Sequence, residues 1–128
     1  MEAQYQLSTG LLECFSTHAI FHFTGQRYDL PEALEFTKVV DLHYRNRKCV
    51  VISNRTITKK INPEVYTTYV SKSVVVVAIV SMSDDVREEA VAEQSLYNGA
   101  FTFFHSLEDA VRWGETVVKK VSLLAFRR

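Results

Sequence analysis

Glycine and proline are scarce in this sequence, with four glycines and two prolines among 128 residues. Collagen-like, low-complexity and disordered chains are rich in these residues, so the composition argues against all three classes. Hydrophobic residues make up 47% of the chain and charged residues 23%, the ordinary proportions of a globular protein. A chain of this length buries a core without a disulfide or a metal, and we expect a single domain over residues 1–128.

Cysteine is also scarce, with only Cys14 and Cys49, and each lies in an apolar run typical of a strand. This excludes a disulfide-rich scaffold. No N-terminal stretch has the basic, apolar and small-residue order of a secretory signal, so we expect a cytoplasmic protein with two buried thiols. A disulfide or a reactive thiol is the alternative, since Arg47 and Lys48 precede Cys49.

Neither charge sign is in excess, because fifteen lysines and arginines balance fifteen aspartates and glutamates. A neutral chain has no overall attraction to nucleic acid, and we expect none to bind. The most apolar run, Val74–Val80, is far too short to span a bilayer, so we expect no membrane insertion. Weak charge repulsion between copies favours self-association, and we expect a homodimer.

Short apolar runs predict five strands, the first two of them joined as a β-hairpin by the polar residues 16–18. The run Val74–Val80 lacks alternation, which is typical of a strand covered on both faces, so we expect helices on both sides of the sheet. The predicted strands are Leu11–Phe15, Ala19–Thr24, Cys49–Ile52, Val74–Val80 and Ala100–Phe104.

Four helices are predicted from capping side chains followed by apolar residues at helical spacing. Pro31 and Pro63 fall in first turns, where a backbone N–H has no partner to lose. The order β-β-α-β-α-β-α-β-α predicts an α/β fold, a five-stranded mixed, mostly parallel sheet with four helices. The predicted helices begin at Asp29, Asn62, Ser83 and Ser106.

Several segments together resemble a known family. The run Val50-Val51-Ile52 enters a connector containing Ile57, and Asn62-Pro63-Glu64 then opens a helix. After the apolar strand at 76–80, the aromatic strand Phe101–Phe104 leads into a helix that contains Leu107 to Trp113. Over residues 19–118 this pattern resembles the STAS-like, or SpoIIAA-like (anti-sigma-factor-antagonist-like), fold and its small uncharacterised bacterial members. The resemblance implies a regulatory or protein-interaction module of the bacterial cytosol.

The regulatory STAS proteins carry a phosphorylation switch that this sequence lacks. In them an Asp-Ser pair opens the second helix, and a partner kinase phosphorylates its serine. This chain has Asn62-Pro63 at the matching place, and Ser53 where many relatives have an aspartate. The resemblance therefore implies a module without the phospho-switch.

No motif for catalysis is present. The histidines at 18, 22, 43 and 105 lack the spacing of a metal site, and no serine lies in a GxSxG turn. The four glycines are isolated, so no phosphate-binding loop exists. We expect no enzymatic activity, no metal and no cofactor.

The connector after the third strand carries the candidate binding site. Arg55, Lys59 and Lys60 form a basic stretch beside a helix start, which suits an anion or an acidic partner. Ligands of open α/β sheets bind at the carboxyl ends of the strands, where this stretch should lie. Tyrosines on the next helix suit an interface. The candidate binding residues are Ser53, Arg55, Thr56, Lys59, Lys60, Asn62, Tyr66 and Tyr69.

Two functions follow from these observations. The first is a non-enzymatic protein-interaction or regulatory module, a homodimer in which the apolar C-terminal segment Val121–Phe126 meets a second copy. The alternative is a small-molecule or lipid-binding module with a pocket at the carboxyl ends of the strands. A flat apolar patch would favour the first function, and a cavity between the sheet and the helices would favour the second.

Overall fold

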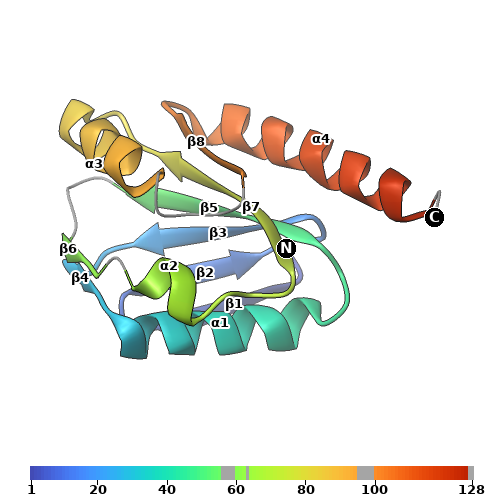
Figure 1. The fold of residues 1–128 in the computed structure, drawn as a ribbon, viewed down its shortest axis with the longest axis horizontal. Helices are drawn as coiled ribbons and strands as arrows, with labels where there is room; N and C mark the ends of the chain where they lie inside the picture. Colours follow the sequence, from blue (N-terminus) through green and yellow to red (C-terminus); the bar gives the residue numbers. More distant parts are fainter. Residues whose placement is uncertain (56–59, 63, 95–99, 127–128) are drawn as a thin grey trace.

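A six-stranded mixed sheet forms the centre of the protein in the computed structural model (Figure 1). The structure describes residues 1–55, 60–62, 64–94 and 100–126, and for residues 60, 66, 93–94, 100–101 and 122–126 it describes the backbone alone. Strands β1, β2 and β3 are antiparallel, whereas β3, β5, β7 and β8 run parallel. In spatial order the strands are β1 (Ala3–Leu7), β2 (Gly10–Cys14), β3 (His18–Phe23), β5 (Cys49–Arg55), β7 (Val74–Val80) and β8 (Ala100–Phe104).

Helices cover both faces of this sheet, as the apolar run at 74–80 predicts. Helices α1 (Leu30–Tyr44) and α3 (Asp84–Gln94) pack on one face, and α4 (Leu107–Phe126) packs on the other. The short helix α2 (Val65–Thr68) is a single turn beside α1. Strands β4 (Arg27–Tyr28) and β6 (Lys60–Ile61) pair in parallel as a separate two-stranded sheet.

The capping residues act largely as expected. Asp29 Oδ1 accepts a hydrogen bond of 2.7 Å from the backbone N–H of Leu30, which opens α1. Ser83 Oγ accepts from Val86 N at 3.4 Å, and Ser106 Oγ from the third residue after it at 3.2 Å. These bonds satisfy first-turn N–H groups that have no partner within their own helix.

The predicted number of five strands is wrong, because Ala3–Leu7 adds β1 as a sixth. In β1 the buried Leu7 and the half-buried Tyr5 alternate with the exposed Gln4 and Gln6. Alanine and glutamine contribute little strand propensity, so this weak alternation is stabilised by antiparallel pairing with β2. The pair β4–β6 was also not predicted, since its strands have two residues each and lie far apart in sequence.

The short helix predicted to begin at Asn62 starts later than expected. Asn62 Oδ1 accepts from the backbone N–H of Glu64 at 3.0 Å, which closes a local turn. The helix itself starts at Val65 and ends at Thr68. Pro63, expected at the first helical position, lies outside the described residues.

Two apolar layers hold the helices against the sheet. On the α4 face, Val50 and Ile52 pack with Ala110 and Val118. A side chain at Gly114 would begin 3.0 Å from Val50, so the missing side chain lets α4 approach β5 closely. On the opposite face, α1 buries a stripe that includes the fully buried Val40 and Tyr44. None of the described helices is both long enough and apolar enough to cross a lipid bilayer.

The two cysteines are buried and free, as predicted. Cys14 lies on β2 and Cys49 on β5, and β3 runs between these strands. Two strand spacings separate their backbones by roughly 9–10 Å. This separation is beyond the Cα–Cα reach of a disulfide, so the alternative of a Cys14–Cys49 bridge is wrong.

A candidate ligand pocket between the sheet and helix α1

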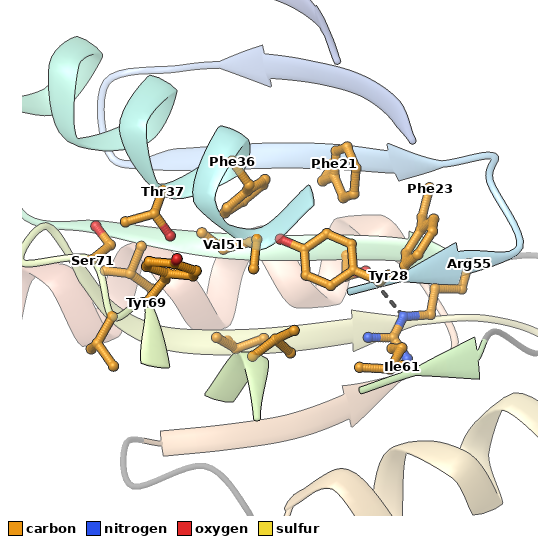
Figure 2. A pocket seen from close by; sticks show the side chains of 16 residues that line it. Phe21, Phe23, Tyr28, Phe36, Thr37, Val51, Arg55, Ile61, Tyr69 and Ser71 are labelled. Atoms are coloured by element: carbon orange, nitrogen blue, oxygen red, sulfur yellow. Dashed lines mark hydrogen bonds between the residues drawn. The ribbon is translucent and has the colours of Figure 1, made fainter. Parts of the chain in front are cut away.

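A pocket of about 130 Å³ opens between the sheet, α1 and α2 (Figure 2). The sixteen residues that line it come from β3 to β7 and from both helices, and most are aliphatic or aromatic. Because the pocket is mainly apolar with a few polar groups, it has the character of a small-molecule site. The polar lining residues are Tyr28, Thr37, Ser53, Arg55, Tyr69 and Ser71.

The alternation of side chains along the strands builds one wall of the pocket. Phe21 and Phe23 lie two residues apart on β3, and Val51, Ser53 and Arg55 do the same on β5, so all five face α1. Phe21 and Ser53 are also register partners in the parallel pair. The wall is therefore aromatic on one strand and becomes polar toward the carboxyl end of the next.

Helix α1 provides the opposite wall through residues one helical turn apart. Ala33, Phe36 and Thr37 line the pocket at the i, i+3 and i+4 positions. The Phe36 ring packs edge-on against Phe21, with 5.3 Å between ring centroids. The buried Ala33 leaves room beside the aromatic rings, because alanine adds only a methyl group.

The small sheet β4–β6 closes one end of the pocket. Tyr28 of β4 and Ile61 of β6 both line it. Asn62 Nδ2 donates to Asp29 Oδ1 at 2.8 Å, and the Asn62 backbone N–H donates to the carbonyl oxygen of Tyr28 at 2.9 Å. The hydrogen bonds from Asn62 and Leu30 lower the pKa of Asp29. Asn62 thus fastens β6 to the start of α1 and holds the two lining strands together.

Arg55 places a buried guanidinium group at this end of the pocket. Its Nε donates to Ser53 Oγ at 3.1 Å, and its Nη1 lies 3.4 Å from Glu89 Oε1 on α3. Its guanidinium carbon lies 5.8 Å from the centre of the Phe23 ring. Arg55 is 4% exposed and is the single charged side chain among the described residues that line the pocket.

Tyr28 adds a neutral hydroxyl next to this charge. Burial raises the pKa of Tyr28 well above its usual range, and Glu32 and Glu35 raise it further while Arg55 opposes them. The phenol therefore remains protonated at physiological pH. Its O–H can donate or accept a hydrogen bond within an otherwise apolar space.

The predicted site residues are only partly brought together by the described structure. Ser53, Arg55 and Tyr69 line the pocket, and Asn62 fastens its end. Four other predicted residues cannot be placed in the site. Thr56 and Lys59 lie outside the described residues, and for Lys60 and Tyr66 only the backbone is described. The basic stretch therefore contributes one described side chain, Arg55, which points into the fold instead of forming a surface patch.

Most of the lining residues were not predicted as site residues. Phe21, Tyr28, Phe36 and Val77 have the spacing of ordinary core residues, and the sequence offers no signal that distinguishes a cavity wall from filled core. The nearest signal is the pair Phe21 and Phe23, which puts two large aromatic rings on one face of one strand.

A second polar cluster lies on the opposite face of the sheet. His22 Nε2 is hydrogen-bonded to Glu13 Oε1, and His22 Nδ1 lies 3.3 Å from Asn54 Nδ2. Both ring nitrogens are engaged, so the imidazole ties β2, β3 and β5 together rather than presenting a free base. Among the described residues, no group of three His, Cys, Asp or Glu side chains is arranged to hold a metal ion.

Comparison with known proteins identifies the fold. No family model and no curated protein matches the sequence. The structure matches a crystal structure of an uncharacterized protein from the DUF3478 family with a SpoIIAA-like fold, from Shewanella loihica PV-4, with a TM-score of 0.55. The match has 14% sequence identity and covers 80% of this chain and 90% of that one. This chain has a SpoIIAA-like fold.

The SpoIIAA-like fold confirms the resemblance seen in the sequence. At 14% identity the likeness concerns the fold alone. The feature of this SpoIIAA-like protein that bears on its function is the pocket on its α1 face.

Proposed function

We propose that this SpoIIAA-like protein is a non-enzymatic binding module for a small, largely apolar molecule. The observation that supports the proposal is the pocket of about 130 Å³ with its aromatic and aliphatic lining. An apolar cavity of roughly 150 Å³ is known to bind benzene, so this pocket fits a ligand of about one ring or a short chain. The sequence predicted this function as the alternative, with a pocket at the carboxyl ends of the strands. The observed pocket reaches that region at Arg55 and also extends along α1.

The energetic cost of the pocket supports a ligand. Apolar surface that stays in contact with water costs about 25 cal/mol per Å², and most of the side chains that line this open pocket are aliphatic or aromatic. A bound apolar molecule would offset the cost by filling the space between Phe21, Phe36 and Val51.

Thermal denaturation with and without indole tests this proposal. Indole at a concentration ten times its Kd should stabilise the wild-type protein by about 1.4 kcal/mol. The variant Ala33→Leu, which places three more carbon atoms in the pocket, should lose this stabilisation. The variant Leu42→Met is the matched control, because Leu42 is an exposed residue of the same helix outside the pocket lining.

Two results would contradict the proposal. One is the absence of any saturable shift with indole, toluene and benzyl alcohol at millimolar concentration. The other is equal stabilisation of the wild type and of Ala33→Leu, which would place the binding outside the pocket.

The protein-interaction module, as a homodimer, is the second candidate function. The observation that favours it is α4, whose C-terminal turns extend past the end of the sheet (Figure 1). Val121 in this part is half-buried, and the side chains of residues 122–126 lie outside the description. A helix that continues beyond its own sheet can pack against a second copy of the chain.

A further inference from the structure

We propose that the pocket selects monocarboxylates, with Arg55 binding the carboxylate and the aromatic walls holding a body of one ring or a short chain. This inference rests on the proposed binding function and adds the chemical class of the ligand. Figure 2 shows the arrangement: Arg55 and Ile61 lie at one end of the pocket, and Phe21, Phe36 and Val51 lie between them and Tyr69.

The charge of the lining favours an anion. Arg55 carries the one formal charge among the described lining residues, and no carboxylate is among them. Arginine remains protonated when buried, so the guanidinium keeps its positive charge beside Glu89. Next to the largely apolar walls, the attraction between this group and a ligand anion is stronger than in bulk water.

The guanidinium is held in place for such a contact. Ser53 Oγ accepts from Nε, and the Phe23 ring lies alongside the guanidinium carbon, so the side chain is fixed from two directions. Fixed geometry lowers the entropic cost of binding a carboxylate to the planar fork of N–H donors.

Among the described contacts of Arg55, Glu89 is the carboxylate with which a ligand carboxylate would compete. Its Oε1 lies 3.4 Å from Arg55 Nη1, longer than the ~2.7–2.9 Å of a strong charge-assisted hydrogen bond. The Glu89 side chain is 21% exposed, so it lies at the edge of the buried region around Arg55. A ligand carboxylate that enters the pocket can therefore form a shorter pair with Arg55 than the one Glu89 makes.

The other lining residues determine the charge and polarity that the rest of the ligand can have. No second cation is among the described lining residues, so a dicarboxylate would bury an unpaired charge. At the far end, Thr37, Tyr69 and Ser71 offer hydroxyl groups only. The favoured ligand therefore has one carboxylate and an apolar body.

Titration calorimetry or NMR titration at pH 7 with phenylacetate and its neutral analogue 2-phenylethanol tests the inference. Wild-type protein should bind phenylacetate about ten- to a hundredfold more tightly, the usual advantage of a hydrogen-bonded charge pair. Arg55→Gln should remove this preference, and Glu89→Gln should raise phenylacetate affinity several-fold by removing the competing carboxylate. Arg112→Gln, on an exposed arginine of α4, should change neither affinity.

The outcomes separate this inference from the proposed function. Equal affinity for the two probes, or a preference that survives in Arg55→Gln, would overturn the carboxylate selectivity and leave the binding function standing. No binding of either probe, or of indole, would overturn both. If Arg55→Gln fails to fold, the inference is tested by the affinities of the wild type for phenylacetate and 2-phenylethanol and by the Glu89→Gln variant. An unchanged or weaker phenylacetate affinity in Glu89→Gln would then contradict the inference.

Discussion

Arg47 and Glu2 form a bidentate ion pair, in which Nη1 and Nη2 of Arg47 each lie 2.9 Å from a carboxylate oxygen of Glu2. His43 Nε2 lies 2.9 Å from the same Oε1 atom. Glu2 stands just before β1, and Arg47 and His43 belong to the end of α1 and the turn after it. The cluster therefore fastens the edge strand that the sequence pattern failed to predict.

This cluster predicts a pH-dependent contribution to stability. Hydrogen bonds from Arg47 and His43 lower the pKa of Glu2 from 4.5 to about 2. Because the folded pKa lies below the unfolded one, the stabilisation is complete above about pH 4.5 and is lost as the pH falls toward 2. Glu2→Gln should thus lower the urea midpoint at pH 7, and its difference from the wild type should vanish near pH 2.

Glu108→Gln is the matched control for this experiment. Its partner Arg112 forms an exposed pair within α4, and such pairs contribute little to stability. The control should have the wild-type midpoint throughout the pH range. A difference between wild type and Glu2→Gln that stays constant from pH 7 to pH 2 would contradict the assignment.

Tyr44 should hold the hairpin connection against the end of α1. Its hydroxyl lies 2.8 Å from the carbonyl oxygens of both Phe15 and His18, and the residue is 1% exposed. Removing a buried hydrogen-bonding group leaves its partners unsatisfied, so Tyr44→Phe should lower the free energy of unfolding by about 1–3 kcal/mol. Urea denaturation followed by circular dichroism measures this change. A loss below about 0.5 kcal/mol would show that water replaces the hydroxyl.

The two cysteines should be inert in the folded protein. Burial raises the pKa of Cys14 to about 11 and that of Cys49 to about 12, so almost no thiolate is present at pH 8. An aromatic disulfide reagent at pH 8 should label neither thiol in the native protein and both in guanidinium chloride. Rapid labelling of one thiol without denaturant would show that its strand opens readily.

The homodimer proposal predicts a change of mass on truncation. If the end of α4 forms the interface, the full chain should have twice the 14.7 kDa of the monomer, and a chain truncated after Lys120 should be monomeric. Size-exclusion chromatography with light scattering measures both masses, and circular dichroism checks that the shorter chain remains folded. A monomeric full chain would refute the dimer and leave the overhanging turns without a partner.

The parts of this fold that could be predicted from sequence depend on near neighbours. The caps at Asp29, Ser83 and Ser106 act on N–H groups within three residues, so each helix start is encoded locally. The unbroken apolar run at 74–80 requires cover on both faces in any arrangement of the chain. Strand β1 had a weaker signal of the same local kind. The pair β4–β6 had none, because its two short strands lie far apart in the sequence.

Local sequence patterns were enough to predict the α/β class, the order of most elements, the SpoIIAA-like fold and the burial of both thiols. The pocket, and the direction of Arg55 into it, could be found only in the folded structure. A cavity is the difference between the space enclosed by distant segments and the volume of the side chains that enter it. Phe21, Phe36 and Tyr69 come from three such segments, and nothing in their local patterns records how much space remains between them.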